Sequence, residues 1–211
     1  IPTELFPDGN DMRPRTYGMP RWCDLFTPRQ LLGHLTLMDA LREMKPRIIE
    51  ELGKDRGRAV VTYLQFAIDK GLDYNSRQTR WIYQRGQVSG TFGRHDFSFK
   101  WTFGEMVFAG PHSGPKWCLS QIVDAYSGIA ELVDTAPVDN TLRIVNGSGA
   151  QMSDLADSSV DVVVNDPPYY NNVMYAELAD YFYVWQRRSL ASLYPELFAG
   201  YLTDKQSETV A

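Results

Sequence analysis

The sequence predicts an α/β fold: part of a parallel sheet with flanking helices and an aromatic-rich β-hairpin insertion. Three observations support this prediction. Apolar residues recur at helical spacing over residues 31–41 and 116–133. Residues 160–164 (VDVVV) form a β-branched run with one polar residue, which is typical of a strand buried on both faces. Residues 91–107 alternate in part and are dense in Phe and Trp, which favours a hairpin.

The first long helix has clear start signals. Thr27 suits the N-cap, Pro28 the first helical position and Gln30 the capping-box position. One buried stripe follows, made of Leu31, Leu32, Leu35, Met38 and Leu41. Pro46 is expected to end or kink the helix, because proline removes a backbone donor and clashes with the preceding turn.

Two further helices follow from the same spacing rule. One is predicted over residues 55–70, with Gly71 as its stop. Another begins near residue 172 and carries an apolar stripe that we expect in the core. The stripe consists of Met174, Leu178, Tyr181, Phe182 and Trp185. Glu177 and Asp180 are expected on a solvated face.

The chain divides into an arm and one larger region. Residues 1–25 are rich in Pro and Gly and predict an irregular arm. Residues 26–211 contain the α/β region, in which residues 74–110 are the insertion. Leu142–Val145 is expected to be a strand that precedes the strand Val160–Val164.

Composition excludes several classes of protein. No run approaches the ~20 apolar residues that span a bilayer, so we expect no membrane partner. Cys23 and Cys118 are far apart and predict neither a disulfide scaffold nor a zinc site; they fit a reducing cytoplasm. The three histidines are scattered, so no metal site is expected. The net charge of −5 disfavours general phosphate binding.

The predicted strand at 160–164 ends at Asn165 and the tetrapeptide Asp166-Pro167-Pro168-Tyr169. Prolines fix φ and cannot continue a sheet, so the chain leaves the strand in a rigid direction. A carboxylate and a carbonyl are then two neighbouring acceptors, suited to an NH₂ group, and an aromatic face suits a flat heterocycle. The ligand that fits both is a nucleobase with an exocyclic amine. Acceptors that hold both hydrogens would stabilise the charge that grows when the amine attacks an electrophile.

Asp-Pro-Pro-Tyr after an apolar strand resembles the catalytic motif of amino-methyltransferases that use S-adenosylmethionine. Two longer stretches resemble the large adenine-specific DNA methylases of prokaryotes, whose members carry a zinc ribbon elsewhere: FTPRQLLGHLTLMDAL, from residue 26, and LRIVNGSGAQMSDLADSSVDVVVNDPPYYNNVMYAELADYFYVW, from residue 142. FGRHDFSFKWTFGE, from residue 92, belongs to the same similarity. The resemblance implies a Rossmann-like methyltransferase sheet over residues 26–211.

The resemblance also implies a site. Asp166, Pro167, Pro168 and Tyr169 would be catalytic, with Tyr169 stacking on the base and Asp166 also lying against the cofactor. Thr27 and Pro28 would hold the methionine end of S-adenosylmethionine, and Gly147 and Ser148 would lie near its adenosine. Ser148 departs from the acid that is common at its position. The family's Phe-x-Gly-x-Gly loop is missing, so we expect the cofactor site to be completed by an upstream part of the same protein.

Basic residues lie among the rings of residues 75–104, where Asp96 is the one acid. This mixture favours nucleic-acid contact, although alternating rings in a hairpin are also ordinary core. The predicted contacts to nucleic acid are Arg77, Arg80, Arg85, Arg94, Tyr169 and Tyr170.

The expected reaction is methyl transfer to N6 of adenine in DNA, with the target base flipped out of the duplex. Two alternatives stay open: a DNA- or partner-binding fragment without activity, and an amino-methyltransferase that acts on cytosine, RNA or protein.

Overall fold

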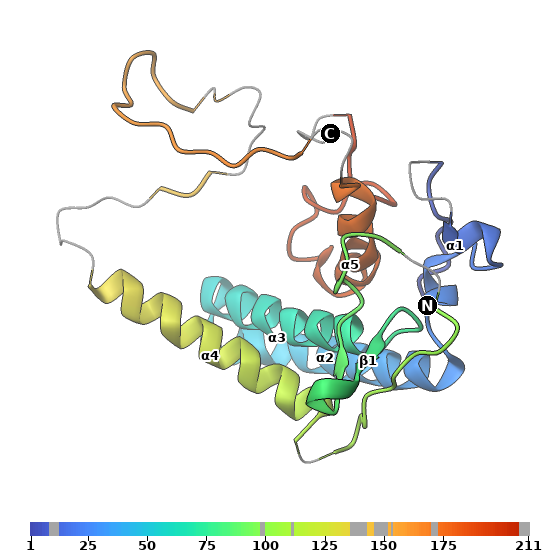
Figure 1. The fold of residues 1–211 in the computed structure, drawn as a ribbon. Helices are drawn as coiled ribbons and strands as arrows, with labels where there is room; N and C mark the ends of the chain where they lie inside the picture. The colour runs from blue at the N-terminus through green and yellow to red at the C-terminus, as the bar shows by residue number, and fades with distance from the viewer. Residues whose placement is uncertain are drawn as a thin grey trace.

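The computed structural model shows a mainly helical protein, which corrects the predicted α/β fold class (Figure 1). It describes residues 1–8, 13–97, 100–110, 112–135, 143–145, 152, 154–169 and 173–206. Within these residues the one sheet is a two-stranded antiparallel hairpin, so no parallel Rossmann-like sheet is formed there. Four long helices, α2 to α5, supply most of the structure.

Helices α2 (Pro28–Leu52) and α3 (Lys54–Tyr74) form an antiparallel pair. Gly53 joins them at φ 77°, a conformation that favours glycine. A Cβ atom on Gly57 would lie 2.7 Å from the Cα of Ile49, so the two helices approach closely where they turn. Pro46 does not end α2, which continues to Leu52, and the expected stop of α3 at Gly71 was wrong, because α3 continues to Tyr74.

Helix α4 (Gly114–Asp134) confirms the helix predicted over residues 116–133, and it packs against α3, where Tyr126 contacts Tyr63 edge to face. The helix then leaves the body, and large apolar side chains along it are exposed. They are Leu119, Val123, Tyr126, Ile129, Leu132 and Val133. Among the described residues, no helix combines the length and the hydropathy needed to cross a membrane.

The N-terminal residues fold onto the helical body rather than trailing from it. They contain the one-turn helix α1 (Arg13–Thr16), the 3₁₀ helix η1 (Trp22–Leu25) and a bridge between Leu5 and Arg21. Phe6 stacks on Trp22 with ring centroids 3.9 Å apart, and both are buried. Aromatic burial therefore ties this segment to the core.

Helix α5 (Tyr175–Leu190) confirms most of the stripe predicted to be core: Leu178 and Phe182 pack half-buried against the core that holds Tyr181 and Trp185, whereas Met174 precedes the helix and is half-buried outside that cluster. Tyr181 and Trp185 are fully enclosed, and both pack against Phe26. The Tyr181 hydroxyl donates to the Leu72 carbonyl at 2.7 Å, which satisfies the polar end of a buried ring.

Asp180 corrects the expectation of a solvated face. Its side chain is fully buried, and Oδ1 accepts hydrogen bonds from the backbone and hydroxyl of Thr203, each at 2.8 Å. Lys205 donates to Oδ2 at 2.6 Å. The segment after α5 therefore folds back and supplies partners to a buried charge, which is the arrangement such a charge requires.

A second buried carboxylate lies between α3 and α5. Asp69 accepts hydrogen bonds from Gln65 Nε2 at 2.8 Å and from Gln186 Nε2 at 2.6 Å. The Gln65 carbonyl in turn accepts from the Ser189 hydroxyl. Burial raises the pKa of Asp69 to about 7, although both amide donors oppose that change.

The hairpin lies outside the stretch predicted for it. Strand β1 (Arg80–Ile82) pairs with β2 (Gln87–Ser89) through the 3₁₀ turn η2 (Tyr83–Arg85), with Trp81 opposite Val88. The described residues among 91–107 form turns and bends without a strand. Phe97 nevertheless joins the core against Trp22, so its ring is used for packing rather than for a pleated face.

The two strands predicted at 142–145 and 160–164 are absent from the described residues. Residues 143–145 and 160–164 belong to no sheet and are exposed, with Val164 at 90%. The reason is the lack of partners, because a strand needs neighbours for its backbone groups and a packed face for its side chains. A β-branched run alone supplies neither.

Candidate functional site

Thr27 begins α2 as the sequence predicts. Its hydroxyl accepts from the backbone of Gln30 at 3.2 Å, and the Gln30 side chain accepts from the backbone of Thr27 at 2.8 Å. This reciprocal pair satisfies two backbone donors of the helix terminus, and Pro28 needs none at its position. The helix start is therefore fixed by two reciprocal hydrogen bonds.

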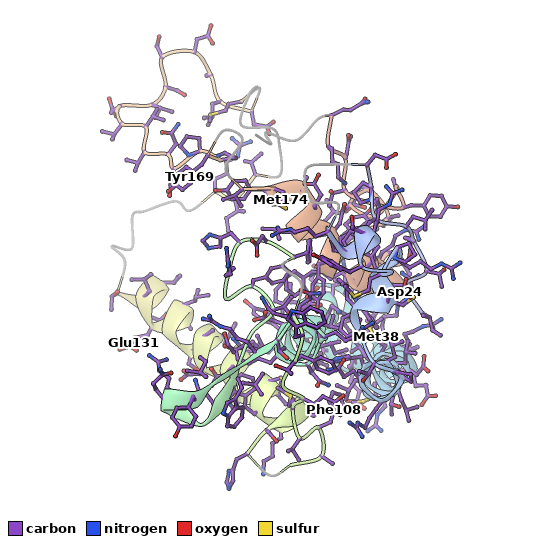
Figure 2. The ribbon with its side chains drawn as sticks, turned by 45° about the vertical axis from the view of Figure 1, so that its right-hand side comes forward. Asp24, Met38, Phe108, Glu131, Tyr169 and Met174 are labelled. Carbon is purple, nitrogen blue, oxygen red and sulfur yellow. The ribbon has the colours of Figure 1, made fainter. Side chains whose placement is uncertain are left out.

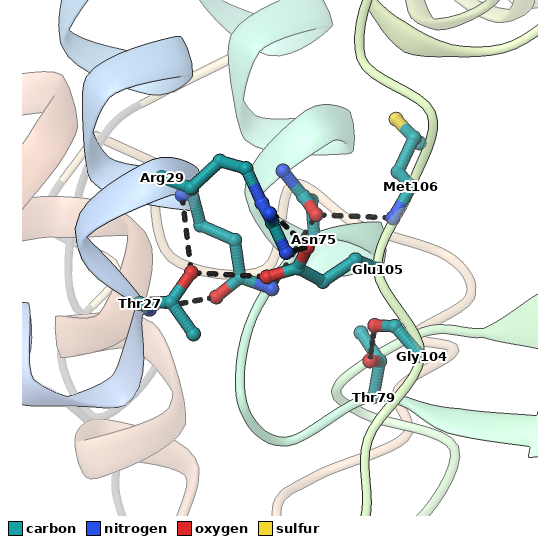
Figure 3. Close-up of polar contacts among 8 residues, drawn as sticks. Thr27, Arg29, Asn75, Thr79, Gly104, Glu105 and Met106 are labelled. Carbon is teal, nitrogen blue, oxygen red and sulfur yellow. Dashed lines mark hydrogen bonds and ion pairs between the residues drawn. The ribbon is translucent and has the colours of Figure 1, made fainter.

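An open pocket of about 580 Å³ lies at this helix start. It is lined by Thr27, Pro28, Arg29, Phe103 and Glu105. The Thr27 hydroxyl donates to one oxygen of Glu105 at 3.0 Å, and Arg29 binds the other oxygen through Nε at 2.9 Å and through a second nitrogen (Figure 3). Glu105 is mostly covered, whereas the guanidinium of Arg29 is largely exposed.

The wall of the pocket that carries Glu105 is fixed by the residues around it. The side-chain carbonyl of Asn75, at the end of α3, accepts from the backbone of Met106 at 3.1 Å and from Gln30 Nε2 at 3.4 Å. Thr79 donates its hydroxyl to the Gly104 carbonyl. These bonds tie residues 104–106 to α2 and α3, so the Glu105 carboxylate is held in place before any ligand arrives.

The pocket offers a carboxylate, a guanidinium, a hydroxyl and a ring within a volume typical of ligand sites. A ligand group that carries both an ammonium and a carboxylate would pair with Glu105 and Arg29. The methionine end of S-adenosylmethionine carries both groups, and it would have to share Glu105 with the bonds from Thr27 and Arg29. Sequence reasoning identified Thr27 and Pro28 but missed Arg29, Phe103 and Glu105.

The tetrapeptide Asp166-Pro167-Pro168-Tyr169 lies on an extended segment that leaves the helical body (Figures 1 and 2). Asp166 and Pro167 are exposed, Pro168 is half-buried, and Tyr169 is 55% exposed. None of the four lines the pocket at Thr27. The acceptors and the ring are thus accessible, but the structure does not bring them together with Thr27 and Pro28.

The four predicted arginines have different surroundings. Arg77 donates to the Asp24 carbonyl at 3.0 Å, which gives it a structural role. Arg94 lies 3.7 Å from Asp96. Arg80 and Arg85 are exposed on the hairpin. The remaining predicted residues, Gly147, Ser148 and Tyr170, lie outside the described residues.

A second, smaller pocket of about 180 Å³ lies among α2, α3 and α4 and is lined by apolar side chains alone. In the part of the chain that the structure describes, no group of three or more His, Cys, Asp or Glu residues is arranged to hold a metal ion.

No protein-family model matches this chain, and no curated protein or solved structure matches it. The resemblance to the adenine-specific DNA methylases therefore stays a prediction from the residues quoted above.

Thr27→Ala is expected to lower the free energy of unfolding by about 1–2 kcal/mol, because the helix cap and the bond to Glu105 are both lost. Thr27→Ser keeps the hydroxyl and should stay within about 0.5 kcal/mol of the parent. Urea denaturation followed by far-ultraviolet circular dichroism measures both. Equal losses in the two variants would contradict a role for the hydroxyl.

Proposed function

We propose that this chain is the catalytic part of an enzyme that transfers a methyl group from S-adenosylmethionine to N6 of adenine in DNA. The observation that carries the proposal is the tetrapeptide 166–169, which combines a carboxylate, a backbone carbonyl and a ring, all exposed to solvent. Such a set suits an aromatic amine and few other groups.

Each member of the tetrapeptide has a physical role in the proposal. The Asp166 carboxylate and the Pro167 carbonyl accept the two hydrogens of the amine, which draws the nitrogen lone pair out of conjugation with the ring. The same two acceptors stabilise the positive charge that develops on the nitrogen. Tyr169 stacks on the base, which must be flipped from the duplex because its amine is otherwise stacked and paired.

The cofactor would lie in the pocket at the start of α2. Glu105 would bind its ammonium, Arg29 and Thr27 would bind its carboxylate, and Phe103 would cover its apolar part. When bound, the cofactor supplies a sulfonium methyl group as the electrophile. Gly147 and Ser148 are proposed to contact its adenosine, and an upstream part of the protein would complete the site. Because neither cysteine is in a disulfide, the proposed setting is the cytoplasm.

The distance between the pocket and the tetrapeptide favours a second candidate. Methyl transfer needs donor and acceptor in contact, and the tetrapeptide does not line the pocket. A chain that keeps this separation would bind DNA or a partner without transferring a methyl group.

Incubation of the full-length protein, which includes the upstream part that completes the cofactor site, with radiolabelled S-adenosylmethionine and DNA, RNA or protein distinguishes the candidates. Label on N6 of adenine in DNA is the expected result. Label on cytosine, RNA or protein would replace the substrate that we propose. Calorimetry of S-adenosylmethionine binding, measured in parallel, tests the pocket separately. DNA binding without labelled product and without heat of cofactor binding would support the second candidate, a protein that binds DNA without transferring a methyl group.

A further inference from the structure

The β1–β2 hairpin exposes large rings that the core does not use. Trp81 is 58% exposed and Tyr83 is 86% exposed, and Trp101 on the neighbouring segment is 91% exposed. Figure 2 shows the hairpin at the edge of the helical body. Aromatic side chains normally contribute most when they are buried, so exposed rings on the hairpin and on the segment packed beside it point to a binding surface.

Positive charge gathers beside these rings. The hairpin, residues 80–89, contains two arginines and no acid. Burial lowers the pKa of Lys100, and Arg94, Arg80 and Arg13 lower it further, while Asp96 opposes them. Lys100 therefore lies near three arginines and one carboxylate. Asp96 is bound by Arg13 at 3.2 Å and lies 3.7 Å from Arg94.

The hairpin and the segment that carries Trp101 are packed together. A Cβ atom on Gly104 would lie 2.7 Å from a methyl carbon of Val88 on β2, and Thr79 binds the Gly104 carbonyl. A Cβ atom on Gly93 would lie 3.6 Å from Nε of Arg80. The next ring along this segment, Phe103, lines the pocket at Thr27. The surface thus leads from the hairpin to the pocket.

We propose that this hairpin surface, formed by Arg80, Trp81, Tyr83, Arg85, Arg94, Lys100 and Trp101, binds single-stranded DNA. Rings stack on unpaired bases, whatever the base, and the cations bind the phosphates between them. A duplex hides the faces of its bases, so it offers phosphates to the cations but nothing to the rings. Binding of single-stranded DNA by this surface does not depend on methyl transfer, so the inference goes beyond the proposed reaction.

The test is binding of a short, mixed-sequence, fluorescein-labelled single strand to the full chain without cofactor, followed by anisotropy and by quenching of tryptophan fluorescence. The single strand is expected to bind at least about tenfold more tightly than the duplex of the same sequence. The double variant Trp81→Ala/Tyr83→Ala should lose about tenfold or more in affinity for the single strand. Trp81→Phe/Tyr83→Phe keeps the ring faces and should lose much less.

Charge is tested with Arg80→Gln/Arg85→Gln, which should weaken binding and reduce its dependence on salt. Tyr201→Ala and Arg47→Gln remove an exposed ring and an exposed cation elsewhere and should leave binding unchanged. Equal affinity for duplex and single strand, tighter binding to RNA than to DNA, or full binding by the Trp81→Ala/Tyr83→Ala variant would each overturn the proposal. Because no cofactor is present, these results are independent of whether the chain transfers a methyl group.

Discussion

Asp166→Ala is expected to slow methyl transfer by at least about 100-fold, while the affinity for S-adenosylmethionine changes little. The carboxylate acts where charge develops, so its loss is felt in the transition state more than in the bound state. Asp166→Asn keeps one acceptor but replaces the other with a donor, and it should retain part of the rate.

Asp161→Ala is the matched control, because Asp161 is an exposed acid of the same segment. Single-turnover measurements with radiolabelled cofactor separate the chemical step from binding. Unchanged turnover in Asp166→Ala would remove the role that we assign to this carboxylate. Loss of cofactor affinity to the same extent as rate would instead show that Asp166 acts mainly by binding the cofactor.

The contribution of Asp69 to the free energy of unfolding is expected to fall as pH rises from about 4 to about 7. Its pKa is near 4 in an unfolded chain and about 7 in the folded protein. The folded state therefore holds a proton that the unfolded state has released. The contribution of Asp69 to stability is fully present below about pH 4, declines between about pH 4 and about pH 7, and is absent above about pH 7. It amounts to about 4 kcal/mol at most.

His34 acts in the opposite direction over part of the same window. Burial lowers its pKa from 6.5 to about 4, although the hydrogen bond between its Nε2 and the Asn75 carbonyl opposes this. The folded state holds His34 neutral, so its contribution is present above 6.5 and is lost as pH falls toward 4. The total pH profile therefore conceals Asp69, and a comparison of variants is needed.

Asp69→Asn removes the titration of that site. The new amide can keep its carbonyl toward Gln65, whose own amide is fixed by Ser189, and donate to Gln186 once the Gln186 amide turns over. Between pH 5 and pH 8 the parent should lose about 2–3 kcal/mol relative to this variant in urea denaturation. Asp39→Asn, at an exposed position on α2, should track the parent. Parallel profiles for parent and Asp69→Asn would show that Asp69 is not protonated in the folded state.

Helices were predictable because their signals are local. The cap at Thr27 and the stripe of α4 are read from neighbouring residues, and both helices are present. Strands depend on distant partners, which a run such as Val162–Val164 cannot reveal. The same limit explains Asp180: its spacing on α5 is that of a surface residue, and only Thr203 and Lys205, folding back, make burial possible.

The candidate site shows the same division. Thr27 and Pro28 were found because a helix start has a sequence signature, whereas Glu105 lies far along the chain and reaches them only through the fold. The one sequence feature that could have indicated Glu105 is its position as an acid directly after a basic, aromatic stretch. The exposed rings of Trp81 and Tyr83 could not be told from core rings, because alternation is common to both.

Thr203 and Lys205, near the C-terminal end of the described residues, supply hydrogen bonds to the buried Asp180, so the helical core depends on this peripheral segment. A chain shortened to end before Thr203 would lose a backbone donor, a hydroxyl and an ammonium together, and the buried Asp180 carboxylate of α5 would lose those partners. Removal of this C-terminal segment is therefore expected to destabilise α5.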